Sequence, residues 1–245
     1  MPRIAILGGT GYLASIIRNQ NNLKKNRYTF FSRNKNSKNY INFSNFDKNI
    51  IFLKKYNFII HLVGPNNNQI KEKKSLISEK NEITKKICDL CLKHNIKLIY
   101  ISSMQVYKHY GKINLSINSK IDLKNLYAKS HSESEKIILK KFKKYKNMYT
   151  ILRLGNVFGY RKYLNLDGLN KNLIHGFCKS ALEKKIIIVN NGSIQREFIP
   201  SKIFVDVINK TIQKKIFNNS IINIGYKVYN LKEISLIIQK RFKLI

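Results

Sequence analysis

The chain has 245 residues, of which 43% are hydrophobic, so it is long enough to bury a sizeable core. No apolar run reaches the roughly 18–20 residues that cross a membrane. We therefore expect no integral membrane segment, and no secretory signal before the first predicted strand. Because three cysteines do not describe a disulfide framework, the expected location is cytoplasmic.

The formal net charge of +34 would ordinarily suggest a nucleic-acid or membrane partner. However, the basic residues are dispersed along the chain in short clusters such as Lys140-Lys141. Trp is absent and Ala occurs only at positions 5, 14, 128 and 181, a bias that indicates an AT-rich coding sequence. We therefore expect a solvated lysine surface that favours anionic substrates, and no nucleic-acid partner.

The first predicted strand, Ile4–Leu7, leads directly into glycines and then into a helical segment. Gly9, Gly11 and Ala14 match G-x-G-x-x-A, which is typical of dinucleotide-binding turns. Gly8 and Gly9 allow a tight turn with positive φ, Gly11 leaves room for a pyrophosphate, and the helix N-terminus attracts its charge. A glycine turn without a ligand is the alternative. The predicted cofactor contacts are Gly8, Gly9, Thr10, Gly11, Tyr12 and Leu13.

The end of the second predicted strand, Tyr28–Ser32, bears on the type of cofactor. NAD-binding proteins carry an acidic residue about 20 residues after the glycines, whereas Arg33 occupies this region here and could hold a 2′-phosphate. A surface arginine is the alternative, and we favour NADP over NAD. After a short strand at Tyr40–Phe43, Asp47 is either a partner for an adenine amino group or a solvated loop residue.

A further strand, Asn57–Val63, ends in Leu62-Val63-Gly64. Gly64 at its carboxyl end would let the backbone approach the cofactor ribose. We expect His61, inside this strand, to be a packed residue and not a ligand.

The long helix predicted at Ser75–His94 carries Cys88 and Cys91 three residues apart. This spacing places both thiols on one helix face, where small buried cysteines are common. Because the remaining cysteine, Cys178, is distant in sequence, we expect neither a metal site nor redox chemistry.

The rest of the chain continues the alternation of strands and helices. A strand at Lys97–Ser102, a helix at Asp122–Tyr145 and a strand at Tyr149–Leu154 predict a Rossmann-type, doubly wound parallel α/β sheet. A helix at Asn170–Leu182 and a strand at Lys185–Val189 then belong to a small, shortened substrate lobe. We place the dinucleotide-binding domain at residues 1–155 and this lobe, interleaved with the sheet, at 156–245.

Several motifs follow the glycine turn in a fixed order: His61–Gly64, Ser102–Tyr107, Tyr127, Arg153–Gly159, Gln195–Ile199 and Asn223–Gly225. In this order the chain resembles, nearly end to end, an extended short-chain dehydrogenase/reductase of the nucleotide-sugar epimerase/dehydratase family. The resemblance implies an NAD(P) cofactor, with Leu62, Val63, Gly64 and Ser102 beside it, and a nucleotide-diphosphate sugar as substrate. It also implies a homodimer built on the long helices near Ile77–Cys91 and Asn125–Leu139.

The resemblance implies that Ser103 hydrogen-bonds the sugar oxygen and that Tyr127 is the base during hydride transfer. Family members carry a lysine four residues after this tyrosine, which lowers its pKa and holds the nicotinamide ribose. His131 stands there in this chain, and Lys129 points to another side of the helix. Three interpretations stay open: His131 substitutes as hydrogen-bond partner and part-time cation, another lysine fills the role, or redox chemistry has been lost.

Two further sets of residues narrow the implied function. Asn156 and Arg196 resemble the contacts to the substrate phosphates, although Arg196 is alternatively a surface partner of Glu197. Met104 and Gln105 stand where related 4,6-dehydratases carry an Asp–Glu pair, and neither titrates, so dehydration is not expected. The expected function is an epimerase or 4-keto-reductase of surface polysaccharide synthesis. The alternative is an impaired member that keeps the cofactor as a structural or sensing ligand.

Overall fold

The structure is a computed structural model that describes residues 1–19, 27–32, 41–42, 45–108, 110–111, 115–159 and 173–243. Its centre is a seven-stranded sheet of order β3-β2-β1-β4-β5-β6-β9, in which every pairing is parallel. Its strands are β1 (Arg3–Leu7), β2 (Arg27–Ser32), β3 (Ile41–Asn42), β4 (Phe58–His61), β5 (Lys97–Ser103), β6 (Tyr149–Leu154) and β9 (Ser220–Ile224). The strand order changes direction between β1 and β4, where open α/β sheets bind ligands. The predicted Rossmann-type fold is confirmed.

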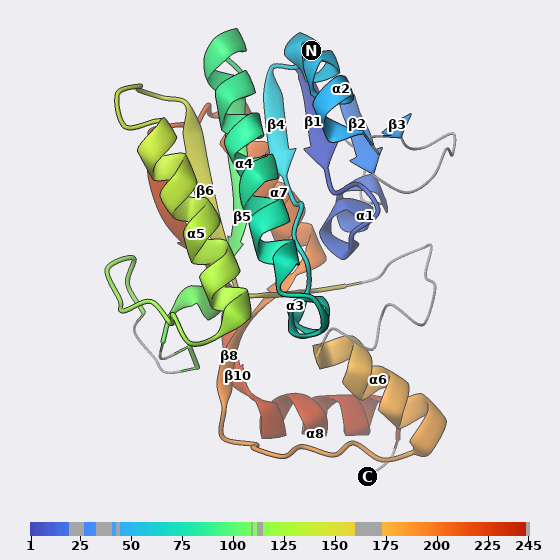
Figure 1. The fold of residues 1–245 in the computed structure, drawn as a ribbon. Helices are drawn as coiled ribbons and strands as arrows, with labels where there is room; N and C mark the ends of the chain where they lie inside the picture. The colour runs from blue at the N-terminus through green and yellow to red at the C-terminus, as the bar shows by residue number, and fades with distance from the viewer. Residues whose placement is uncertain are drawn as a thin grey trace.

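Helices cover both faces of this sheet, with α4 and α5 on one face and α1 and α7 on the other (Figure 1). The helices are α1 (Tyr12–Asn19), α4 (Ser75–His94), α5 (Leu126–Lys141) and α7 (Ser201–Gln213). Along β5, Leu98 and Tyr100 join the core under α4 and α5, whereas Ile99 and Ile101 join the opposite core. Because successive side chains of a strand point to opposite faces, both faces need apolar residues, and the strands read as continuous apolar runs.

Short helical segments complete this part of the chain: α2 (Phe46–Asn49), η1 (Ile50–Lys55), α3 (Asn67–Glu72) and η2 (Met104–Val106). The start of α5 is set by Asn125, whose side chain accepts hydrogen bonds from the backbone N–H groups of Tyr127 at 2.9 Å and Ala128 at 3.2 Å. This cap makes the helix begin later than the predicted Asp122. None of the helices in the described residues is both long and apolar enough to cross a membrane.

A small lobe lies beyond the carboxyl ends of the sheet strands (Figure 1). It contains β7 (Asn156–Phe158), α6 (Leu173–Lys184), β8 (Gln195–Pro200), β10 (Lys227–Asn230) and α8 (Leu231–Arg241). Its three strands have the order β10-β8-β7, and α6 and α8 cover them around Phe198. Between β8 and β10 the chain returns to the large sheet through α7 and β9, so the two parts are interleaved in sequence.

The strand predicted at Lys185–Val189 is wrong. Lys185 follows α6 with a left-handed φ of +55°, and the next residues pair with no strand in the described part of the chain. Ile187 packs into the core of the small lobe, but Ile186 and Ile188 are 53% and 72% exposed. A run of β-branched residues does not form a strand without a sheet edge to join.

Candidate functional site

A cleft of about 950 Å³ opens at the carboxyl ends of the strands, between the large sheet and the small lobe. Its volume lies at the upper end of the range for ligand pockets. The predicted site residues in its wall are Gly8, Thr10, Gly11, Tyr12, Leu13, Leu62, Val63, Gly64, Ser102, Ser103, Tyr127, His131, Asn156 and Arg196. Residues far apart in the sequence therefore meet at one site. Two other predicted contacts, Gly9 and Asp47, do not border the cleft, and Arg33 lies outside the described residues.

The glycine turn is shaped by close approaches between backbones. Gly8 has a φ of +89°, and a Cβ at this position would lie 3.0 Å from the carbonyl carbon of Leu62. A Cβ on Gly11 would lie 3.2 Å from the carbonyl oxygen of Gly8. Gly8 needs glycine for its positive φ, and Gly11 leaves a tight space that a Cβ would crowd.

Gly9 has a different function from the predicted one. Its φ is not positive. The backbone N–H of Gly9 donates to the carbonyl of Phe31 at 2.8 Å and so joins the turn to β2. A Cβ there would meet Phe30 and Phe31 at 3.0 Å. The prediction of positive φ at both Gly8 and Gly9 is thus correct for Gly8 only, and Gly9 packs the turn against the sheet.

Asp47 lies in the first turn of α2 and forms an ion pair with Lys86 of α4. Its side chain is 68% exposed, and the neighbouring Phe46 borders the cleft in its place. This carboxylate therefore links α2 to α4. Because it does not border the cleft, its position does not support the predicted contact with an adenine.

A contact across the mouth of the cleft was not predicted. The hydroxyl of Tyr12, in the first turn of α1, donates to the carbonyl of Gly159 at 3.2 Å. His175 of α6 lies 3.2 Å from the same carbonyl through Nε2, and its ring meets Tyr12 edge to face at 5.2 Å between centroids. The glycine turn and the small lobe are thereby held together. The isolated histidine at position 175 carries no signal by which the sequence could have identified this contact.

Ser103 and Tyr127 face each other in the cleft wall. Ser103 ends β5, and its hydroxyl accepts from the backbone N–H of Gln105 at 3.2 Å. Tyr127 is in the first turn of α5. Burial raises the pKa of Tyr127, and a hydrogen bond with the Ser103 side chain acts in the opposite direction. The pair places two hydroxyl-bearing side chains beside each other in the wall of the cleft.

His131 lies one helical turn after Tyr127, and its ring packs edge to face on the tyrosine with centroids 4.7 Å apart. Its Nδ1 is 3.1 Å from the hydroxyl of Tyr100. Burial, followed by the charge of Lys80 and the nearby His61, holds the pKa of His131 well below 6.5. The imidazole is therefore neutral at neutral pH. This direction of the pKa disfavours the interpretation of His131 as a part-time cation, and the ring keeps its hydrogen-bonding capacity.

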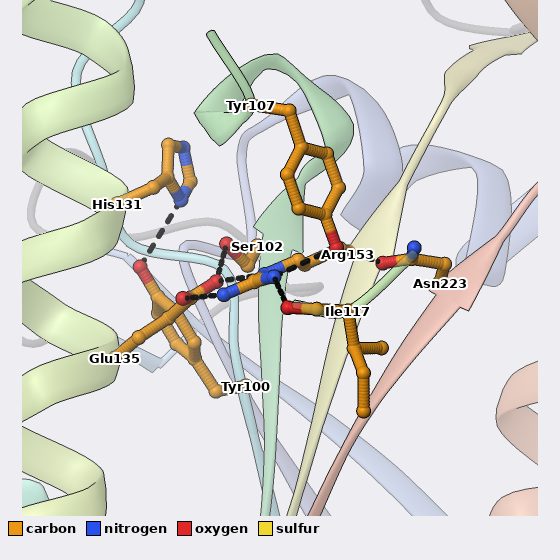
Figure 2. Close-up of polar contacts among 8 residues, drawn as sticks. All are labelled: Tyr100, Ser102, Tyr107, Ile117, His131, Glu135, Arg153 and Asn223. Carbon is orange, nitrogen blue, oxygen red and sulfur yellow. Dashed lines mark hydrogen bonds and ion pairs between the residues drawn. The ribbon is translucent and has the colours of Figure 1, made fainter. Parts of the chain in front are cut away.

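A buried ion pair joins Glu135 to Arg153, close to Ser102 at the end of β5 (Figure 2). Glu135 of α5 accepts from Arg153 of β6 at 2.9 Å through Oε1 and at 2.6 Å through Oε2, and from the Ser102 hydroxyl at 2.6 Å. Arg153 also donates to the Tyr107 hydroxyl at 2.7 Å, which in turn donates to Asn223 of β9 at 2.7 Å. These bonds connect α5 to the carboxyl ends of three strands and so position the elements that carry Ser103 and Tyr127.

This network was missed at the level of the sequence. Arg153 belongs to a motif that was recognised, and Glu135 lies four residues after His131. Their separation of 18 residues, however, gives no sign that they meet. The signal that exists is the presence of a charged residue inside the apolar strand β6, because a buried charge needs a partner.

On the side of the small lobe, Arg196 and Asn156 converge on Tyr110. The guanidinium of Arg196 lies 4.5 Å from the centre of the Tyr110 ring, and its Nη1 donates to the carbonyls of Tyr110 at 3.2 Å and Gln195 at 2.8 Å. Asn156 donates to the Tyr110 hydroxyl at 2.9 Å. Gly111 has a φ of +104°, and a Cβ there would lie 2.3 Å from Nη1, so the arginine needs this glycine. The bonds of Nη1 thus hold the guanidinium over the Tyr110 ring, at the cleft, and none of them goes to Glu197.

The remaining predictions concern four uncharged side chains: Met104, Gln105, Cys88 and Cys91. Gln105 borders the cleft, whereas Met104 is buried beside Val106 and Tyr107. Cys88 and Cys91 are buried in the core under α4, and burial raises the pKa of the Cys88 thiol to about 12. Within the described residues, no group of three or more His, Cys, Asp or Glu side chains is arranged to hold a metal ion.

Fold and site together define a Rossmann-type α/β protein with a glycine turn and a Ser–Tyr pair in one cleft. The family model described as the NAD dependent epimerase/dehydratase family matches residues 4–225. The chain therefore belongs to the NAD-dependent epimerase/dehydratase family.

Several solved structures share the fold. The UDP-N-acetylglucosamine 4-epimerase from Bacillus cereus has a TM-score of 0.83 and 19% identity, over 100% of this chain and 83% of that chain. The UDP-N-acetylglucosamine 4-epimerase from Methanobrevibacter ruminantium M1, in complex with UDP-N-acetylmuramic acid, has a TM-score of 0.79 and 22% identity, over 99% and 82%. The dTDP-glucose 4,6-dehydratase from Bacillus anthracis, in complex with NAD, has a TM-score of 0.78 and 18% identity, over 98% and 81%. A search of curated protein sequences gives no match.

Proposed function

We propose that this chain is an NAD(P)-dependent nucleotide-sugar epimerase or 4-keto-reductase that acts by hydride transfer at a sugar carbon. The observation that carries this proposal is that Ser103 and Tyr127 border the same cleft as the glycine turn. No Asp or Glu occurs among the described residues that line this cleft. Since dehydration needs groups that donate and accept protons at the sugar, their absence there favours epimerisation or reduction over dehydration.

The glycine turn fits a dinucleotide. Gly8 and Gly11 border the cleft without a side chain, so the backbone at these two positions is accessible to a ligand. The first turn of α1 also leaves N–H groups without partners inside the helix, which suits a pyrophosphate. When bound, the nicotinamide supplies the group that accepts and returns the hydride. The choice between NADP and NAD depends on Arg33, and thermal-shift titrations with both cofactors test it.

The residues around the Ser–Tyr pair have distinct roles in this proposal. Tyr127 accepts the proton of the sugar hydroxyl during oxidation and returns one during reduction, and Ser103 donates a hydrogen bond to the sugar oxygen. Tyr100 keeps its proton because burial raises its pKa well above 10, so its hydroxyl is available to donate to Nδ1 of His131. This arrangement places the imidazole proton on Nε2, where it serves as a neutral donor to a cofactor hydroxyl.

The opposite end of the cleft suits the diphosphate of a nucleotide sugar. Arg196 presents a guanidinium that is stacked on Tyr110 and so held in one orientation. Asn156, which borders the cleft, adds an amide beside it. Charge-assisted hydrogen bonds from a fixed guanidinium are the strongest contacts available to a phosphate here.

The test is turnover of UDP-glucose, UDP-N-acetylglucosamine and dTDP-glucose by the full chain with NAD⁺ or NADP⁺, and of their 4-keto forms with NADH or NADPH. We expect a 4-epimer or a reduced sugar as product, and loss of the product in Tyr127→Phe. Equal turnover by wild type and Tyr127→Phe would overturn the assignment of the base.

A second candidate is a family member that binds the cofactor without turning over a sugar. The neutral state of His131 favours it, because α5 then offers no cation to stabilise the phenolate of Tyr127. A ligand that binds only the native state stabilises it by about 2.7 kcal/mol at a hundredfold excess over Kd. A cofactor-dependent rise in Tm without turnover of any tested sugar would select this candidate over the first.

A further inference from the structure

The strands of the large sheet begin at an edge of the molecule that lies opposite the small lobe (Figure 1). A second cavity, of about 530 Å³, opens at this amino-terminal edge. No Asp or Glu occurs among the described residues that line it. Five of its lining residues are cations, and they come from four separate parts of the chain: Arg3, Lys54, Lys55, Lys97 and Lys215. The fold thus gathers basic residues that are dispersed in the sequence.

None of these five cations forms an ion pair with a carboxylate of the described residues. More lysines lie at the same edge, because α4, α5 and α7 each end a few residues before a sheet strand begins. The helix ends and the turns that follow them contribute these lysines: Lys93, Lys140, Lys141, Lys143, Lys144, Lys146, Lys210 and Lys214. Lysines in a last helical turn suit the helix dipole, but Arg3 and Lys97 begin strands. Although Lys141 pairs with Asp89, the edge keeps a large excess of positive charge.

Two large apolar side chains are exposed beside the cations at the end of η1. Ile51 is 43% exposed and Phe52 is 59% exposed, whereas Leu53 is fully buried. Because a 3₁₀ helix repeats every three residues, Ile51 shares its face with Lys54, and Phe52 shares its face with Lys55. Single exposed apolar residues are common in proteins and need no explanation. Here, however, each adjoins a cation at the same edge, which is the combination found in segments that bind at a bilayer surface.

An anionic lipid surface fits this edge better than a nucleic acid does. Single-stranded nucleic acids are bound along a groove that follows their backbone. The cations at this edge instead surround one cavity, which suits separate phosphate headgroups. An aliphatic side chain such as Ile51 gains free energy where it leaves water, and a bilayer interface provides that environment. Anionic headgroups also attract lysines that lie near the membrane surface.

We propose that the amino-terminal edge is a docking surface for an anionic membrane, in which Ile51 and Phe52 enter the interface and the cations around the cavity bind lipid phosphates. Docking in this orientation directs the cleft away from the bilayer, because the cleft and the small lobe lie at the carboxyl ends of the strands (Figure 1). The cleft of a docked protein therefore stays open to substrates from solution. This surface is separate from the site of the proposed function, and the inference does not depend on that function.

The experiment compares faces of the protein, because a chain with a formal net charge of +34 is attracted to any anionic surface. Sedimentation of the full chain with phosphatidylcholine vesicles, with and without phosphatidylglycerol, measures binding. We expect Lys54→Gln/Lys55→Gln to weaken binding to the anionic vesicles at least about tenfold. Lys71→Gln/Lys74→Gln removes the same charge from exposed positions in and beside α3, which borders the cleft, and should weaken binding about twofold or less at physiological ionic strength.

Insertion into the interface can be followed separately, because the chain contains no tryptophan. Phe52→Trp introduces a single fluorophore at an exposed position of η1, and its emission should shift to the blue when phosphatidylglycerol vesicles are added. Ile237→Trp, at a position of α8 that is 51% exposed, is the matched control and should keep its emission. Brominated lipids should quench the emission of the first variant and leave that of the second unchanged.

Three results would overturn the inference. The first is wild type that does not bind phosphatidylglycerol vesicles at physiological ionic strength, a result that needs no variant. The second is an equal loss of binding in both double lysine variants, or unchanged emission of vesicle-bound Phe52→Trp, because the protein then adheres through its overall charge. The third is binding of single-stranded RNA that is tighter than vesicle binding and has the same lysine dependence, which would assign the edge to a nucleic acid. Turnover of sugars is a separate measurement, so failure of docking leaves the proposed function intact.

Discussion

The two walls of the cleft are built by different physical means. The wall at the glycine turn consists of backbone: Gly8 approaches Leu62, and Gly9 donates to Phe31 of β2. The wall at α5 consists of side chains whose charges depend on burial, among them Tyr127 and His131. Close backbone contacts favour glycine, whereas the charge of a buried side chain depends on all the groups that are packed around it. A motif is therefore a good guide to the first wall and a poor guide to the second.

The largest effect is expected on the wall built from side chains. Tyr127→Phe should lower kcat by about 10²–10⁴, because the group that exchanges the proton is lost. Binding of cofactor, measured by thermal shift, should change little, since the glycine wall is intact. Tyr145→Phe, at an exposed tyrosine after α5, is the control and should retain full activity. A Tyr127→Phe protein that loses cofactor binding as well would show that the two walls are not independent.

The buried ion pair between Glu135 and Arg153 should make the largest contribution of this wall to the stability of the protein. Glu135→Gln leaves Arg153, which is 4% exposed, without its carboxylate. Removing one partner of a buried pair typically lowers the free energy of unfolding by about 3–5 kcal/mol. Urea denaturation at pH 7 measures the loss. Glu133→Gln, at a partly exposed pair with Lys129, should cost below about 1 kcal/mol, and similar losses in both variants would contradict the importance of the buried pair.

His61 tests how the buried histidines respond to pH. Burial, followed by the charge of Lys80, lowers its pKa from 6.5 to about 3. The unfolded chain therefore binds the proton between these values and the native protein does not, so stability falls as pH decreases through this window. Between pH 6 and pH 4 the loss from this residue should be about 2.5 kcal/mol.

Denaturation of wild type and His61→Gln at both pH values measures this contribution as a difference of slopes. The variant removes the imidazole that accepts from the backbone N–H of Val63 at 3.3 Å, so its stability at pH 6 is expected to be lower. Its decline toward pH 4 should nevertheless be shallower. Parallel declines in the two proteins would show that His61 titrates normally.

The smallest effect is expected at the glycine wall. Gly8→Ala must hold a φ of +89° with a Cβ 3.0 Å from Leu62, which costs about 1–2 kcal/mol. The midpoint of chemical denaturation and the Kd for the cofactor should both change. Gly64→Ala, whose Cβ would meet only the flexible end of Lys80 at 3.4 Å, should change the denaturation midpoint less. An equal response at both glycines would mean that the backbone approach at Gly8 is not tight.

The sequence predicted the large sheet well because its strands are buried on both faces. Ile4–Leu7 and Tyr149–Leu154 are apolar runs that only a two-sided core explains, and the observed strands β1 and β6 match them within one residue. The same reasoning failed at Lys185–Val189. Its residues pair with no strand in the described part of the chain, although Ile187 packs into the core of the small lobe, so the outcome depends on how the elements of that lobe are arranged.

Local pattern was enough for the apolar runs of the strands and for the glycine turn, whereas the start of α5 was predicted too early because the Asn125 cap was not recognised. Contacts that depend on charge required the tertiary structure. The neutral state of His131 results from burial and from Lys80, which is 51 residues away in the chain, and the partner of Glu135 comes from β6. A close approach of two backbones leaves a glycine in the sequence even when its partner is distant, as with Gly8 and Leu62. Electrostatic interactions act between any groups that folding brings into one low-dielectric space, so their partners emerge only when the helices and strands have been packed together.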